Sequence, residues 1–94
     1  MLDLERGAVE QAIENLRRAT FLVPQDALAQ FSLGRAYAKL GQQSRARIAL
    51  THARRILASM PDEQTIPGGG GIWAGELRRA VDAELTSIGR VAEA

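Results

Sequence analysis

The side chains of this sequence that could take part in catalysis or ligand binding are a single histidine, His52, and a pair of cations, Arg35 and Lys39. His52 has no cysteine or serine placed with it as a nucleophile and base. One histidine cannot build a metal site by itself. We therefore expect His52 to lie on a helix surface, and we expect the chain to have no catalytic residue, no metal site, no cofactor and no enzymatic activity.

Arg35 and Lys39 are four residues apart, so on a helix they would project from one face. Two cations on one face can hold a carboxylate or an acidic peptide. The alternative is an ordinary solvated basic edge, because exposed charge pairs contribute little to stability or binding. The Arg pairs at 17–18, 54–55 and 78–79 form no repeated stripe, and we expect them to lie on solvated faces.

The segment from Gly68 to Gly75 invites comparison with a phosphate-binding loop, because glycine-rich turns before a helix can bind phosphate through backbone N–H groups. The spacing Gly69-x-Gly71-x-x-Ala74 fits the dinucleotide fingerprint only loosely. No predicted strand precedes the glycines, and no P-loop lysine follows them. We expect a flexible or tightly turned connector here and no nucleotide site.

Composition excludes several classes of partner. Twelve Lys and Arg residues face eleven Asp and Glu, so no strong field favours nucleic acid or an anionic membrane. The chain has no cysteine, which excludes a disulfide framework and favours a cytoplasmic protein. Residues 1–7 carry three charges and no apolar run of signal-peptide length, and no other segment is apolar enough to span a bilayer.

A repeat organises the elements that carry these residues. An offset of 34 residues superposes four small or apolar positions, namely Gly7 on Gly41, Ala12 on Ala46, Leu16 on Leu50 and Ala19 on Ala53. Apolar residues recur around them with helical spacing, as in the series Val9, Ile13 and Leu16. We therefore expect helices on both copies and a third helix between them, from Asp26 to Leu40.

The ends of the predicted helices are marked by particular residues. Asp26 after Pro24 can accept a hydrogen bond from a free N–H at the start of a helix, and Gly41 can end it in the left-handed conformation. The next helix is expected to run to Met60. The whole chain is therefore expected to divide into three regions. These are helices over residues 1–61, a Pro- and Gly-rich connector over residues 62–71, and a C-terminal helix over residues 72–94 with Gly89 as a stop.

The spacing of small and large residues resembles the tetratricopeptide (TPR) repeat, whose pattern runs W-x2-L-G-x2-Y and then A-x3-F. The chain has Gln30-x2-Leu33-Gly34-x2-Tyr37 and then Ala46-x3-Leu50, so Gln30 and Leu50 stand where the pattern has aromatics. The resemblance implies an all-α, TPR-like α-solenoid of antiparallel helix pairs with a C-terminal capping helix. Its structural positions would be Ala12, Leu16, Ala19, Pro24, Leu33, Gly34, Tyr37, Ala46, Leu50 and Ala53.

The segment from Pro61 to Arg78 resembles the end of the TPR tails on CheR-type chemotaxis-receptor methyltransferases. In such proteins the methyltransferase domain comes first and the tail docks partners or tunes the enzyme. This resemblance implies that the chain is the non-catalytic C-terminal region of such an enzyme. A free-standing adaptor or assembly protein with no link to an enzyme is the alternative.

The TPR resemblance also implies where a partner would bind. The first helix of each TPR unit lines the concave groove, which here would bring five residues toward a protein or peptide partner: Leu28, Phe31, Ser32, Arg35 and Lys39. The two cations among them would favour an acidic partner. Phe31 either replaces the missing aromatic at position 30 or faces this groove. The face of Val9, Ile13 and Leu16 is expected to lack a partner helix, and to be covered by self-association, by residues 1–6 or by the C-terminal helix.

Overall fold

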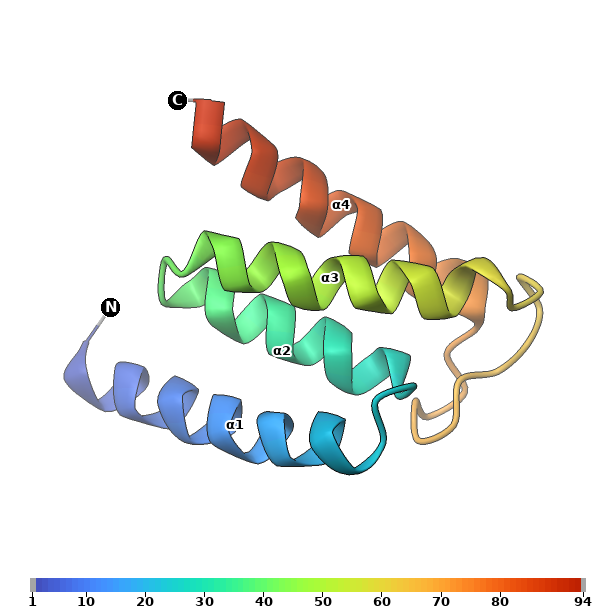
Figure 1. Ribbon diagram of the computed structural model, residues 1–94, viewed down its shortest axis with the longest axis horizontal. Coiled ribbons are helices and arrows are strands. Elements are labelled where there is room, and N and C mark those ends of the chain that lie inside the picture. Colours follow the sequence, from blue (N-terminus) through green and yellow to red (C-terminus); the bar gives the residue numbers. More distant parts are fainter. Residues whose placement is uncertain (1, 94) are drawn as a thin grey trace.

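The computed structural model describes the backbone of residues 2–93 and the side chains of residues 2–90. Within that part the chain forms four helices, α1 (Asp3–Leu22), α2 (Ala27–Lys39), α3 (Gln43–Ala58) and α4 (Ala74–Glu93). Each helix runs antiparallel to the one before it, and α1 and α4 lie on opposite sides of the α2–α3 pair (Figure 1). The predicted all-α class and the antiparallel helix pairs are confirmed.

The α2–α3 pair forms the centre of the core, and its close crossing depends on Gly34. A Cβ atom added to Gly34 would lie 2.6 Å from Cγ of Leu50 and 3.2 Å from the carbonyl oxygen of Ala46. Ala46, Leu50 and Ala53 are fully buried. Gly34 and Ala46 therefore lie at the helix crossing that the sequence pattern predicts, and Leu50 fills the space that the glycine leaves.

The two ends of α2 have the caps that the sequence predicts. Asp26 Oδ1 accepts a hydrogen bond from the N–H of Ala29 at 3.0 Å. At the other end, Gly41 has φ of +75°, and the N–H of Gln42 donates to the carbonyl oxygen of Tyr37 at 3.0 Å. This is the glycine-terminated end that turns the chain sharply into α3.

The segment between α3 and α4 is tightly turned. The N–H of Ile66 donates to the carbonyl of Ile72 at 2.9 Å, and the N–H of Ala74 donates to the carbonyl of Gln64 at 2.7 Å. Ile66 is buried in the core. Of the two alternatives for the connector, flexible or tightly turned, the structure therefore has the second, which packs one of its own side chains inside the protein.

Arg78 ties this connector to the end of α3. One nitrogen of its guanidinium donates to the carbonyl oxygens of Leu57 and Met60, at 2.6 and 2.7 Å, and another pairs with the carboxylate of Asp62. The last carbonyls of a helix have no partner within the helix. The carbonyl of Leu57 accepts from the N–H of Met60 at 3.1 Å and also from the guanidinium, which reaches the carbonyl of Met60 in the turn after α3 as well. This arrangement fixes the first turn of α4 against the last turn of α3.

Three sequence-based helix bounds were wrong. α4 begins at Ala74 and not at residue 72, because Trp73 still pairs with Thr65 in the turned segment. α3 ends at Ala58, before the expected Met60, where Ser59 and Met60 turn away into the connector. α4 continues through Gly89 to Glu93, so Gly89 does not stop the helix. Glycine costs a helix interior about 1 kcal/mol relative to alanine, which the packing of the inward residues Val81 and Ile88 outweighs.

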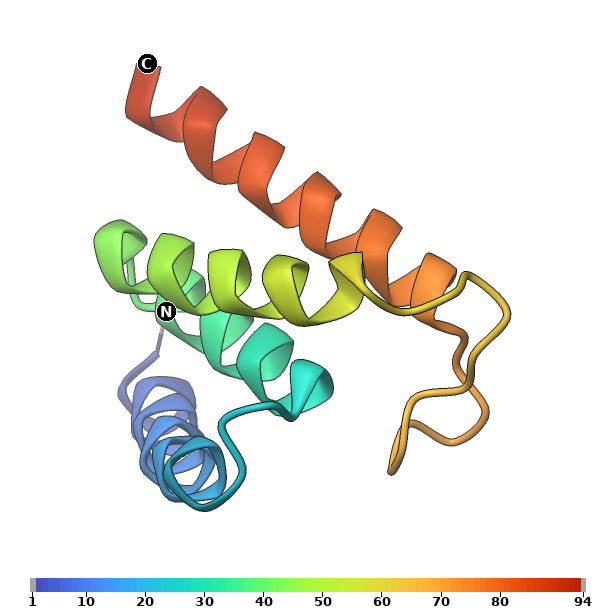
Figure 2. The same cartoon turned by 45° about the vertical axis from the view of Figure 1, so that its right-hand side comes forward.

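The expectation for α1 was also wrong. The face of Val9, Ile13 and Leu16 has a partner, because it packs against α2, and Ile13 is buried. Two of the three expected coverings are absent among the described residues: α4 makes no contact with α1, and residues 3–6 are the first turn of α1 itself (Figure 2). Covering by self-association stays a prediction. Ala12, at the edge of the same face beside Val9 and Leu16, is exposed.

Candidate functional site

The candidate groove residues lie together on one face of α2. Arg35 and Lys39 are exposed, while three others are half-buried at their base: Leu28, Phe31 and Ser32. Their spacing of three and four residues places them in one row along the helix. The structure therefore presents a face with apolar groups at one end and two cations at the other.

Phe31 and Arg35 are in direct contact. The guanidinium carbon of Arg35 lies 5.6 Å from the centroid of the Phe31 ring, within the range of a cation–π interaction. Phe31 also packs against the buried core. The ring of Phe31 therefore orients the guanidinium through its face and uses none of its N–H donors.

A carboxylate already lies beside Arg35. Glu84 Oε1 on α4 is 3.4 Å from Nε of Arg35, and both side chains remain partly exposed. The sequence contains no signal for this pair, since the two residues are 49 positions apart and meet only because α4 packs along α2 as well as α3. An acidic ligand of Arg35 must therefore share the guanidinium with Glu84 or displace it.

A groove of about 310 Å³ runs between α1 and α2 beside these cations. Its wall on α1 is apolar, and its wall on α2 carries Ser32, Ala36 and the two cations Arg35 and Lys39. The α1 side is formed by Ala8, Val9, Ala12 and Leu16. Such a groove offers apolar contact along its floor and two positive charges at its edge, which suits a peptide with an apolar residue next to a carboxylate.

The predicted structural positions are not equivalent in the two copies. In α2 and α3 they are buried, namely Leu33, Gly34, Tyr37, Ala46, Leu50 and Ala53. In the first copy Leu16 and Ala19 are half-buried, whereas Ala12 and Pro24 are exposed. The difference follows from neighbours: α3 is covered on two sides by α2 and α4, while α1 packs against α2 alone.

Gln30, at the position where the TPR pattern has an aromatic residue, is buried with its amide satisfied. Its Nε2 donates to the carbonyl oxygen of Pro24 at 3.3 Å. A buried amide without a partner would destabilise the fold. The bond instead fastens the turn between α1 and α2 to the start of α2. Glutamine in place of the aromatic residue of the TPR pattern therefore keeps the packing of the helix pair.

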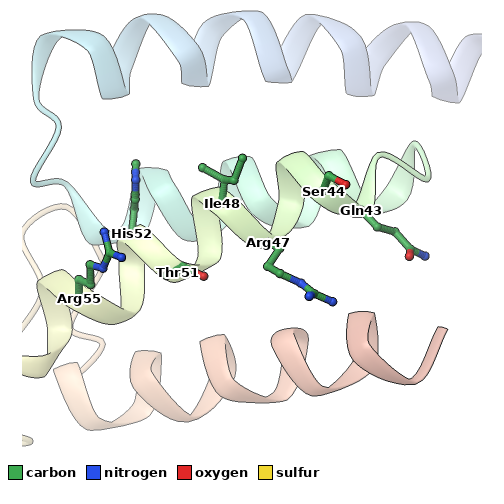
Figure 3. Close-up of a pocket in the computed structure, with 7 residues that line it drawn as sticks. All are labelled: Gln43, Ser44, Arg47, Ile48, Thr51, His52 and Arg55. Atoms are coloured by element: carbon green, nitrogen blue, oxygen red, sulfur yellow. The ribbon is translucent and has the colours of Figure 1, made fainter. Parts of the chain in front are cut away.

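The single histidine of the chain lies on a helix surface. His52 is exposed on α3, where it lies beside Thr51 and Arg55 (Figure 3). No three His, Cys, Asp or Glu side chains in the described part of the chain come together as metal ligands would. None of the helices α1 to α4 is both long and apolar enough to cross a membrane.

Comparison with known proteins supports the repeat. Residues 2–41 match the model of a family described as TPR repeat, a segment that holds α1, α2 and the turn after them. Neither a curated protein nor a solved structure matches the chain. The matched segment ends before α3, so the predicted positions Ala46, Leu50 and Ala53 lie outside it. The first two helices of the chain are therefore similar in sequence to a TPR repeat, a unit that stacks helices and binds proteins.

Proposed function

We propose that this chain is a protein-interaction module that binds a partner along the exposed face of α2. The observation that carries this proposal is the TPR repeat at residues 2–41, within which α2 displays Phe31, Arg35 and Lys39 in one row. Stacked helical repeats use such extended surfaces to hold peptide segments of other proteins. No activity is proposed for the chain.

The chemistry of the face favours a partner segment that carries a carboxylate beside an apolar side chain. Arg35 can bind a carboxylate through its fork of N–H donors, and Lys39 adds a second charge one turn away. The apolar wall of Val9 and Leu16 offers contact for a neighbouring aliphatic or aromatic group. Glu84 competes for Arg35, so binding is expected to be modest and reversible.

A pull-down from native lysate tests this proposal. Wild-type protein and the variants Arg35→Glu and Arg79→Glu are compared, since Arg79 is an exposed arginine on α4 outside the groove. We expect discrete partners to be captured by wild type and by Arg79→Glu, and to be lost with Arg35→Glu. Equal capture by all three proteins, with unchanged helicity, would contradict binding along α2.

A second, more specific proposal concerns the kind of protein to which this chain belongs. We propose that the chain belongs to the C-terminal region of a CheR-type methyltransferase, and its support is confined to the sequence resemblance of residues 61–78. The coding sequence upstream of Met1 tests it: a domain that binds S-adenosylmethionine is expected there. Its absence would leave the free-standing adaptor, the alternative class. Binding of S-adenosylmethionine by this chain alone would contradict both.

A further inference from the structure

Helix α3 carries positive charge and no negative charge. Between Gln43 and Ala58 there are four arginines and His52, and no Asp or Glu. All four arginines are exposed, and none forms an ion pair with any described residue: Arg45, Arg47, Arg54 and Arg55. This differs from α1 and α4, which both carry acidic as well as basic residues. The net charge of +1 thus conceals an excess of positive charge around α3.

An apolar groove lies next to this basic surface. It has a volume of about 500 Å³, runs between α1 and α3, and has Leu33 and Tyr37 of α2 at its base. Its two sides expose large apolar groups, because Phe21 on α1 is 85% exposed and Ile48 on α3 is 59% exposed. Ile48 and His52 point from α3 toward α1 (Figure 3).

Cations stand at the edges of the same groove. Arg17 lies on the α1 side, and Arg45 and His52 lie on the α3 side. Leu33 and Tyr37 project from the side of α2 opposite to Arg35, because residues two apart on a helix point in nearly opposite directions. The groove is therefore a second surface, separate from the face of α2 that carries Arg35 and Lys39.

We propose that this α1–α3 groove binds an acidic amphipathic helix of a partner protein. The apolar stripe of such a helix would pack on Phe21 and Ile48, and its carboxylates would face Arg17 and Arg45. Charge complementarity decides the class of occupant, since the residues that line the groove include Arg17 and Arg45 and no Asp or Glu. The exposed apolar side chains decide against nucleic acid, because phosphates satisfy the arginines but leave the aliphatic Ile48 without a partner.

Fluorescence anisotropy with a labelled synthetic helix tests the proposal on the whole chain. The probe is as long as α3, with Leu on one face and Glu on the other. One control peptide has Lys in place of Glu, and a second has Ser in place of Leu. We expect the acidic Leu peptide to bind with a Kd that rises with salt, and both control peptides to bind at least about tenfold more weakly.

Matched variants locate the binding. Arg45→Glu and Ile48→Ser change exposed side chains, so circular dichroism should show unchanged helicity. Each is expected to weaken the binding of the peptide at least about tenfold, whereas Arg79→Glu, at an exposed position outside both grooves, should leave its Kd unchanged. If these variants do not weaken the binding of the peptide, the proposal of binding along α2 still stands, because that proposal is tested by Arg35→Glu and not by Arg45→Glu or Ile48→Ser.

Three outcomes would overturn the proposal. The first is an unchanged Kd in Arg45→Glu and Ile48→Ser. The second is tighter binding of a single-stranded oligonucleotide than of the acidic peptide, with no effect of Ile48→Ser, which would assign the surface to nucleic acid. The third is a dimer by sedimentation that excludes the peptide and dissociates in Ile48→Ser, which would assign the groove to a second copy of the chain.

Discussion

Glu84 on α4 and Arg35 on α2 form an ion pair across two helices that are not consecutive in the chain, with 3.4 Å between Oε1 and Nε. Both side chains are partly exposed, so solvent screens the pair and its contribution to stability is at most about 1 kcal/mol. Its larger consequence concerns binding. The residue best placed to hold an acidic partner is already held by a carboxylate of the same chain.

Removing the charge of Glu84 should therefore strengthen binding of an acidic partner along α2. Glu84→Gln is expected to lower the Kd of a partner segment by several-fold, with little change in melting temperature. Asp82→Asn is the matched control, because Asp82 is an exposed acid on the same helix without an ion pair among the described residues. Titration calorimetry with a partner recovered by the pull-down measures both. Equal affinities in the two variants would show that Glu84 does not compete.

Gly34→Ala should destabilise the protein although alanine favours helices. Alanine would gain about 1 kcal/mol from helix propensity, but its Cβ would meet Leu50 at 2.6 Å, and overpacking of this kind costs about 1–3 kcal/mol. We expect a net loss of about 1 kcal/mol in urea unfolding. Gly7→Ala on α1, where an added Cβ meets nothing within 4 Å, should instead be neutral or stabilising.

Leu50→Ala should cost about 2–5 kcal/mol, because Leu50 is fully buried and its removal leaves a cavity. Urea unfolding measures this loss as well. Leu4→Ala is the control that should change stability little, because the Leu4 side chain is 90% exposed. In the Leu50→Ala background the clash with the Leu50 side chain is gone, and only the 3.2 Å approach to the carbonyl oxygen of Ala46 remains, so adding Gly34→Ala should cost less than in the wild type. An equal cost of Gly34→Ala in both backgrounds of this double-mutant cycle would contradict the described crossing of α2 and α3.

Arg78→Met should loosen the junction between α3 and α4. It removes the donors that satisfy the carbonyls of Leu57 and Met60 and keeps the apolar stem, so we expect a loss of about 1–3 kcal/mol. Hydrogen exchange should rise most in the connector and in the first turn of α4. The neighbouring Arg79→Met, at an exposed position, should change neither stability nor exchange.

Local signals in the sequence predicted the local parts of the structure. Helical spacing located α1 to α4, Asp26 and Gly41 marked the ends of α2, and the small residues Gly34 and Ala46 marked the crossing of α2 and α3. Each of these depends on residues that are near in sequence or share one repeat register. Caps and periodicity act within a few residues, which is why a single sequence reveals them.

The sequence did not predict the contacts between helices that are far apart in the chain. The bond from Arg78 to the end of α3 and the pair of Arg35 with Glu84 depend on how α4 packs, for which no repeat register exists. Equivalent positions in the 34-residue register also differ in burial, since Ala46 on α3 is buried and Ala12 on α1 is exposed. A position in a repeat becomes core only where neighbours cover it on both sides.

Site-specific photo-crosslinking tests the central claim, binding of a protein along α2, most directly. A photoreactive amino acid is placed at position 32, inside the groove beside Arg35, or at position 63 in the exposed connector as the control. We expect crosslinks to discrete proteins from position 32 alone, and their loss when Arg35→Glu is added. Crosslinks of equal yield from both positions, or crosslinks from position 32 that persist in Arg35→Glu, would contradict it.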